Sequence, residues 1–314
     1  MRKSCLVQLT ILIVIVAVLS LGLSRTVRRA LQSGQRTQHE SSLNAPAEQG
    51  VEPVDDQAGV LIHEPDLTAA PGLLALVSSR PVMLDDCVPA GLALSAQDLY
   101  LACDRTTGQG GYVVRAARDD YAVEARRDVA PTGAAVGGMA WADEGVWLAV
   151  STAGVADHTE LLQLRPDTLE TLTTVTVSAS VLSVAVDDQG LIYTSSCDPG
   201  VLRCWSAAGA IVTEAESPDG ACYTDIELLR GQLVGVAMVH GQGVLDIIDP
   251  SSLTLLARHN LEIVSARGNP LAGNALATDG DVLAFAPDRQ PPPTIMAYRL
   301  REGRLIDLVP ALLP

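Results

Sequence analysis

The feature that most constrains the fold of this 314-residue chain is a pattern that recurs five times after residue 73. Each copy holds a short apolar run, a polar turn and a second apolar run, which is typical of a β-hairpin. The copies begin at residues 91, 138, 183, 225 and 274, so the period lies between 42 and 49 residues. The five segments are GLALSAQDLYLA (91–102), GMAWADEGVWLA (138–149), SVAVDDQGLIYT (183–194), DIELLRGQLVGV (225–236) and NALATDGDVLAF (274–285).

A third and a fourth apolar run follow each hairpin, the last of them being LIDLV (305–309) in the fifth repeat. Four short strands every 40 to 50 residues are typical of a β-propeller blade. A β-sandwich would show frequent turns without this long period. The first two runs of each repeat are apolar at almost every position, as strands packed between neighbouring blades must be. The sequence therefore predicts an all-β fold, a β-propeller.

The number of blades depends on the residues before the first repeat. Two apolar runs, LLALVSS (73–79) and PVMLDD (81–86), precede it and resemble the outer half of a blade. They are predicted to latch onto the last blade and close the ring, because closure removes free strand edges. Five blades with N-terminal latch strands are favoured, and six blades are the alternative.

Residues 5–24 form a separate feature, a stretch of twenty residues without a charge. About 20 such residues are needed to cross a bilayer as a helix. A secretory signal peptide has a shorter apolar region that ends in a small-residue cleavage site, and no A-x-A sequence is present here. An uncleaved signal anchor is therefore favoured over a cleaved signal peptide and over a buried core helix.

The predicted organisation has three parts: a membrane anchor at 1–29, an extended low-complexity tether at 30–72 and the propeller at 73–314. Three arginines follow the apolar stretch while Arg2 and Lys3 precede it, so the positive-inside rule slightly favours a cytoplasmic propeller. Five cysteines in the propeller instead suit an oxidising compartment. We expect a single-pass membrane protein with its propeller on the extracytoplasmic (periplasmic or extracellular) side.

Charge excludes one class of partner. The net charge is −16, and residues 1–45 hold six basic residues and one acidic residue. The remaining 269 residues hold 15 basic and 36 acidic residues, a balance of −21. A surface this acidic repels phosphate backbones, so nucleic-acid binding is not expected.

Three segments resemble YVTN-type propeller repeats: LYLACD (99–104), LIYTSSCD (191–198) and DIIDPSSLTLLARH (246–259). The resemblance covers about 225 residues and implies the propeller fold. The usual Asn of the Y-V-T-N position is replaced by Cys103-Asp104 in one repeat and by Ser196-Cys197 in another. That family includes binding and scaffolding proteins as well as enzymes, so the resemblance implies no particular activity.

The cysteines are the first candidate sites. The repeat alignment places Cys87 and Cys103 at the same rim of one blade, which predicts a disulfide between them. Cys197 and Cys204 stand on opposite arms of one hairpin and are predicted to form a second bridge. Cys222 is equivalent to Cys87 two blades along and could compete for Cys197. An odd number of cysteines leaves at least one thiol free.

A second candidate is the central funnel, where the innermost strands converge. The aligned first positions are Gly91, Gly138, Ser183, Asp225 and Asn274. In gluconolactonase-type propellers, acidic and amide residues at comparable places bind a divalent cation. Only Asp225 and Asn274 could be ligands here, and Ca²⁺ needs six to eight oxygens. The favoured expectation is therefore that these polar residues cap strand ends, with no metal and no cofactor bound.

Three functions from different classes are compatible with these features. The favoured one is a non-enzymatic binding or scaffold subunit of a larger membrane complex, for which an electron-transfer assembly is one candidate. The alternatives are a metal-dependent lactonase or hydrolase with its cation in the funnel, and a secreted binding protein.

The anchor can be tested on the mature protein. If residues 5–24 are an uncleaved anchor, N-terminal sequencing should start at residue 1 or 2 and the protein should stay in the membrane fraction after a high-salt wash. A mature N-terminus near residue 25 would show instead that the segment is a cleaved signal.

Overall fold

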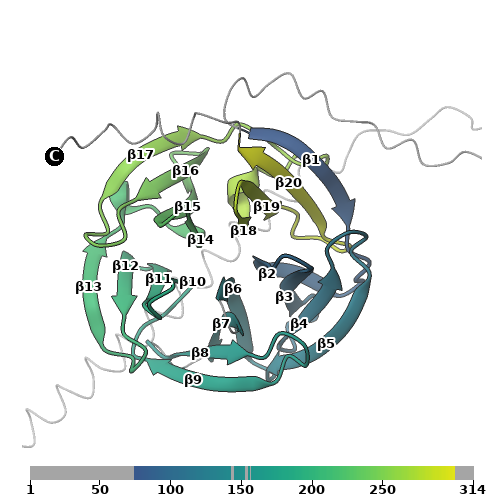
Figure 1. Ribbon diagram of the computed structural model, residues 1–314, viewed down its shortest axis with the longest axis horizontal. Coiled ribbons are helices and arrows are strands. Elements are labelled where there is room, and N and C mark those ends of the chain that lie inside the picture. The colour runs from purple at the N-terminus through teal and green to yellow at the C-terminus, as the bar shows by residue number, and fades with distance from the viewer. Residues whose placement is uncertain (1–73, 143–144, 153–154, 156, 301–314) are drawn as a thin grey trace, which may run out of the picture. The chain divides into compact units, whose positions relative to one another are not determined.

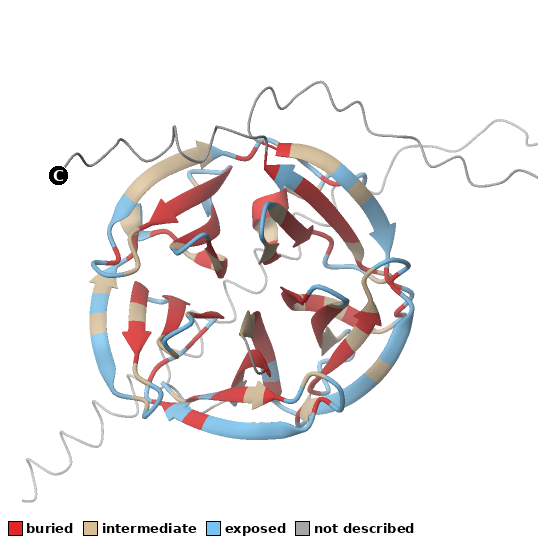
Figure 2. Ribbon diagram, in the orientation of Figure 1, coloured by how far each residue is buried: buried red, intermediate tan, exposed pale blue. Residues whose placement is uncertain are grey.

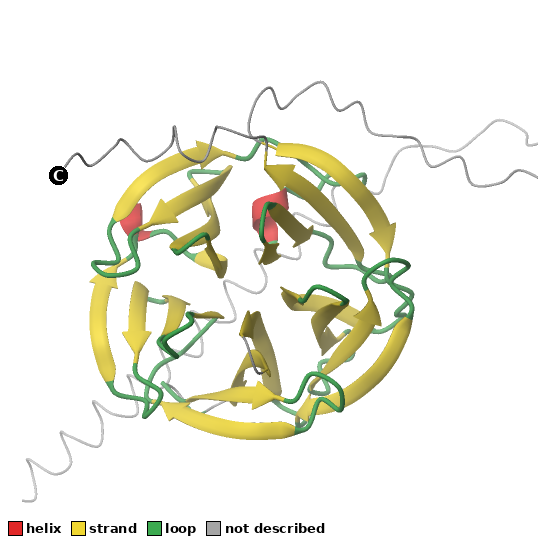
Figure 3. Ribbon diagram, viewed as in Figure 1, coloured by secondary structure: helices red, strands yellow, loops and turns green. Residues whose placement is uncertain are grey.

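A computed structural model describes residues 74–142, 145–152, 155 and 157–300. These residues form twenty strands in five four-stranded antiparallel sheets, arranged as blades around a common axis (Figure 1). Two short 3₁₀ helices, η2 (Pro218–Gly220) and η3 (Leu271–Gly273), lie in connections between blades (Figure 3). The predicted five-bladed β-propeller is confirmed.

The blades follow the repeats. Blade 1 contains β2 (Cys87–Leu94), β3 (Asp98–Arg105), β4 (Gly111–Ala117) and β5 (Val123–Ala130). Blade 2 contains β6 (Ala134–Ala142), β7 (Gly145–Thr152), β8 (Thr159–Leu164) and β9 (Thr171–Val177). Blade 3 contains β10 (Ser183–Val186), β11 (Ile192–Cys197), β12 (Gly200–Trp205) and β13 (Ile211–Glu216). Blade 4 contains β14 (Tyr223–Leu229), β15 (Gln232–Val239), β16 (Gln242–Ile248) and β17 (Leu255–Asn260).

Blade 5 joins both ends of the propeller. It contains β18 (Ala275–Asp279), β19 (Val282–Ala286) and β20 (Thr294–Leu300), and its outer strand is β1 (Leu74–Pro81). The latch is thus one strand, with Leu74 paired to Leu300 and Pro81 to Thr294. The second predicted latch strand, 81–86, is wrong: after Pro81 the chain turns inward to begin blade 1. The fourth run predicted at 305–309 lies outside the described residues.

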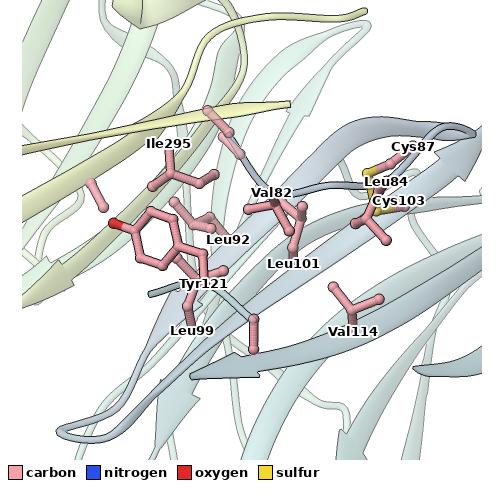
Figure 4. Close-up of a cluster of buried hydrophobic side chains, with 14 of the residues drawn as sticks. Val82, Leu84, Cys87, Leu92, Leu99, Leu101, Cys103, Val114, Tyr121 and Ile295 are labelled. Carbon is pink, nitrogen blue, oxygen red and sulfur yellow. A yellow bond between two sulfur atoms is a disulfide. The ribbon is translucent and has the colours of Figure 1, made fainter. Parts of the chain in front are cut away.

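Five apolar clusters hold the ring together, one between each pair of neighbouring blades. Figure 4 shows the cluster between blades 5 and 1, which contains Ile295 of blade 5 and Leu92 and Leu101 of blade 1. Val82 and Leu84 of the connection after β1 pack into the same cluster, so the closing segment is itself part of the core. Figure 2 shows the result: inner strands are largely buried, whereas outer strands are largely exposed.

The predicted disulfide in blade 1 is present. Cys87 of β2 and Cys103 of β3 are bonded, with their Cα atoms 4.9 Å apart. The register places Cys103 opposite Pro89, two residues from Cys87. The bond therefore links two strands within one sheet, at the end where the chain enters the blade.

The predicted Cys197–Cys204 bridge is wrong. Cys197 is bonded to Cys222, and Cys204 is a free, buried thiol. The reason is the register of β11 and β12, in which Cys204 lies opposite Tyr193, four residues from Cys197. At about 3.3 Å per residue this separation is about 13 Å, too far for a disulfide. Cys222 precedes β14, and its Cα lies 4.6 Å from that of Cys197, so this bond joins blade 3 to blade 4.

The predicted membrane anchor and tether lie outside the described residues. Within the part of the chain that the structure describes, no helix is long and apolar enough to span a membrane.

The disulfides give a prediction that peptide mapping can check. Non-reducing digestion should yield linked peptides for Cys87–Cys103 and Cys197–Cys222, and only Cys204 among the propeller cysteines should alkylate after denaturation. Cys222→Ser should lower the free energy of unfolding by about 3 kcal/mol, because a loop of this length loses its constraint in the unfolded chain. Cys204→Ser is the matched control for a buried cysteine, and it should leave both linked peptides in place. A linked Cys197–Cys204 peptide in the wild-type digest would contradict the structure.

Candidate functional site

The two faces of the propeller differ in what they carry. Because strands alternate in direction, the connections between blades and those between the second and third strands of a blade all lie on one face. We call this the disulfide face, since both disulfides lie there, beside the start of β2 and the end of β11. The remaining hairpin turns form the opposite face. The longest described connection, residues 261–274, belongs to the disulfide face.

The central channel is narrow next to the disulfide face because glycines let the inner strands approach one another. A Cβ on Gly91 would lie 2.6 Å from the carbonyl oxygen of Gly137, and one on Gly137 would lie 2.5 Å from that of Leu182. A Cβ on Gly138 would overlap the carboxylate of Asp225 and lie 2.8 Å from the Cα of Ser183. Blades 1, 2, 3 and 4 therefore meet at these positions with no room for an added methyl group.

Asp225 is fully buried at this meeting point. Its Oδ2 accepts the backbone N–H of Leu276 in β18 at 2.9 Å, and its Oδ1 accepts the N–H of Ile226 at 3.0 Å. Each inner strand has one edge with no neighbouring strand, so its backbone N–H groups there need other acceptors. The Asp225 carboxylate accepts one such N–H from β14 and one from β18. Burial raises the pKa of Asp225 well above its ordinary value, although the two backbone hydrogen bonds act in the opposite direction.

Asn274, the other predicted funnel ligand, also binds backbone. Its Nδ2 donates to the carbonyl oxygen of Pro89 in β2 at 2.7 Å, which ties blade 5 to blade 1. Both residues thus link neighbouring blades; Asn274 directly precedes β18, whereas Asp225 lies within β14 rather than at its end. Among the described residues, no group of three or more His, Cys, Asp or Glu side chains is placed to hold a metal ion.

Glu227 is a buried carboxylate of the innermost strand of blade 4 that the repeat pattern did not single out. It lies two residues beyond Asp225 on β14 and is buried, and its Oε2 accepts the backbone N–H of Leu228 at 3.3 Å. Burial, and then the nearby Asp225 carboxylate, raise the pKa of Glu227 well above its ordinary value. Because alternate residues of a strand lie on the same side, the sequence could have placed Glu227 beside Asp225 on β14.

The disulfide face carries exposed apolar side chains from connections around the ring. Met83 is 73% exposed in the connection between blades 5 and 1. Four more large apolar residues are exposed on this face, near the ends of strands or between them: Val155, Leu182, Met238 and Val264. The other exposed large apolar residues of the described chain lie on outer strands, namely Val77, Val123, Leu172, Ile211, Val212 and Leu255. None lies in a described turn of the opposite face.

A polar groove of about 770 Å³ lies on the disulfide face over the end of blade 1 and its connection to blade 2, lined in part by Asp86, Arg105 and Asp128. Arg105 forms ion pairs with both carboxylates. The Tyr112 hydroxyl donates to Asp86 Oδ1 at 2.7 Å, and the guanidinium of Arg126 lies 3.6 Å from the Tyr112 ring centroid and pairs with Asp86. Burial would raise the pKa of Asp86, but hydrogen bonds from Arg126 and Tyr112 outweigh it and hold that pKa below its ordinary value. The groove is therefore lined by paired charges, and Met83 precedes its Asp86 by three residues in the chain.

Comparison with known proteins supports the fold alone. No protein-family model matches the chain, and no curated protein matches it in sequence. The glutaminyl cyclase of Myxococcus xanthus is similar in structure, with a TM-score of 0.54 at 11% identity, over 73% of this chain and 97% of that one. A protein of unknown function from Bacteroides caccae has a TM-score of 0.46 at 12% identity, over 63% of this chain and 70% of that one. At this low identity, the similarity to the glutaminyl cyclase shows a shared fold alone.

The raised pKa values of Asp225 and Glu227 indicate how the stability of the folded protein should depend on pH. A carboxyl group whose pKa is raised by folding stabilises the protein fully below its unfolded pKa of about 4.3, and this contribution is lost as pH rises toward the folded-state pKa. Glu227→Gln removes the buried ionisable group and keeps its size. As pH rises from 5 to 8, we expect the variant to lose less stability than wild type. The difference should grow by about 1.4 kcal/mol for each pH unit that lies below the folded-state pKa of Glu227.

The measurement is urea unfolding at both pH values, with Glu214→Gln as control because Glu214 is an exposed carboxylate on the outer strand β13. Parallel pH profiles for wild type and Glu227→Gln would show that Glu227 titrates normally in the folded protein.

Proposed function

We propose that this chain is a non-enzymatic binding subunit whose disulfide face docks onto a protein partner. In this proposal, residues 5–24 anchor the chain in a membrane, the propeller lies on the extracytoplasmic side, and the partner is another subunit of a membrane complex. The YVTN-type repeat resemblance is part of the same proposal, because that family includes scaffolding propellers.

The observation that carries the proposal is the uneven distribution of exposed apolar side chains. Met83, Val155, Leu182, Met238 and Val264 come from several blades and share one face. Single exposed apolar residues are ordinary on protein surfaces. Outside the outer strands, however, every exposed large apolar residue of the described chain lies on the disulfide face, as is typical of an interaction surface. The two disulfides and the Asp86 ion-pair cluster brace the same face, so it can bind without paying a large ordering cost.

Charge indicates what the partner surface should look like. Five acidic residues are exposed in the described connections of the disulfide face: Asp85, Asp157, Asp198, Asp219 and Glu262. Exposed arginines there are Arg267 and Arg289. Complementary potentials favour association, so the partner should offer an apolar patch rimmed by lysine and arginine.

The channel supports binding rather than catalysis as the role of the propeller. Asp225 Oδ2 and Asn274 Nδ2 bind backbone groups of neighbouring blades, and glycines let the inner strands of blades 1 to 4 approach closely. These interactions position strands. The hydrolase alternative needs the same two residues as cation ligands, which would compete with bonds that hold the ring together.

A partner test compares two surfaces of the same protein. The full chain should be isolated from its native membranes in mild detergent with a stoichiometric partner bound. Met83→Asp combined with Val264→Asp should weaken retention about 100-fold, since each buried large apolar side chain contributes about 1.5 kcal/mol or more.

Val123→Asp combined with Leu255→Asp places the same charges on outer strands and should retain the partner. A monodisperse monomer from native membranes, or equal loss of the partner in both double variants, would contradict the proposal. Metal analysis of the wild-type protein, with unfolding measured with and without chelator, would separately reveal the hydrolase alternative.

A further inference from the structure

The perimeter of the propeller consists of five outer strands, each with one edge unpaired within the described chain. They follow one another around the rim, and the end of β9 points toward the start of β13 (Figure 1). An exposed strand edge can pair with another chain, and proteins usually guard such edges with charges or proline. Whether an edge is guarded can therefore be judged from the residues of each outer strand.

Four of the five outer strands are guarded. β1 contains Arg80 and Pro81, and β5 contains Glu124, Arg126, Arg127 and Asp128. β13 contains Glu214 and Glu216, and β17 contains Arg258 and His259. β9 is different: its sequence, TLTTVTV, has neither charge nor proline.

The exposure of β9 also fits a pairing edge. Thr171, Leu172, Thr173, Thr174 and Thr176 are all exposed, while Val175 and Val177 pack inward. Threonine and valine have high β-propensity, so the strand is well suited to accept a neighbour. Ile211 and Val212, at the start of β13, are 53% and 56% exposed and extend this uncharged strip beyond the end of β9. The turn before them is close by, since a Cβ on Gly209 would lie 3.2 Å from the carbonyl oxygen of Thr176.

We propose that β9 pairs antiparallel with β9 of a second copy of this chain, so that blade 2 of each copy joins one continuous eight-stranded sheet. A two-fold axis at the centre of β9 places Thr174 opposite its own copy, Thr173 opposite Val175 and Leu172 opposite Thr176. A threonine pair stabilises antiparallel strands, and no like charges lie opposite each other in this register. A two-fold interface of this kind uses the same surface on both copies.

A second copy fits this edge better than it fits the other outer strands. Self-pairing of β5 about its centre would bring Arg126 of one copy opposite Arg127 of the other, and pairing of β13 would gather four carboxylates. Like charges at these positions oppose pairing. The dimer would use the perimeter, so the disulfide face of each copy stays open to its partner.

The oligomeric state of the full chain in mild detergent tests the proposal, measured by light scattering or sedimentation up to roughly 100 µM. Wild type should be a dimer. Thr174→Lys places two ammonium groups opposite each other and should weaken dimerisation at least tenfold. Thr174→Glu should do the same.

Mixing the two Thr174 variants should restore a heterodimer detectable by native mass spectrometry, because lysine then faces glutamate. Leu255→Lys on β17 is the matched control and should remain dimeric. Thr174 is exposed, so circular dichroism and thermal unfolding of both variants should match wild type. A monomeric wild type, a dimer insensitive to Thr174→Lys, or a failure of the mixed variants to associate would overturn the proposal.

Discussion

Apolar packing between adjacent blades fills all five interfaces of the ring. Each sheet buries both of its faces, so the side chains of one strand alternate between two clusters: Leu101 packs toward blade 5 and Ala102 toward blade 2. A sheet with two apolar faces cannot be stable at the end of a row, because its outer face would meet water. The blades must therefore form a closed ring, and closure depends on β1 completing blade 5.

Closure decides which parts of the chain are free to act. The inner strands are used in packing, and their remaining edge donors are satisfied by residues such as Asp225. This leaves two faces and a perimeter as available surface. The two faces then differ because connections of variable length gather on one of them, where both disulfides lie. In our proposals the disulfide face meets a partner and the perimeter meets a second copy, so the two interactions do not compete for surface.

The cross-blade disulfide supports the same constraint covalently. Cys197–Cys222 joins blades 3 and 4, whereas Cys87–Cys103 lies within blade 1, the blade beside the closing segment. A ring held by five separate apolar clusters can open at any interface, and a covalent bond removes one of those openings. The bonds also suit the oxidising compartment that the cysteine count predicts.

The repeat, and with it the fold class and the start of each blade, could be predicted from the sequence, because strand period and turn chemistry are local properties. The sequence also indicated that N-terminal residues close the ring, but it predicted two latch strands where only β1 pairs with β20. It also identified Cys87–Cys103, since both residues occupy equivalent ends of paired strands. Only the tertiary structure decided the partner of Cys197, because the relevant distance runs between blades while the distance along the hairpin to Cys204 is too long. The same holds for Glu227 and for the role of Asp225: burial and contact with β18 arise only when five blades converge, and no local pattern encodes that convergence.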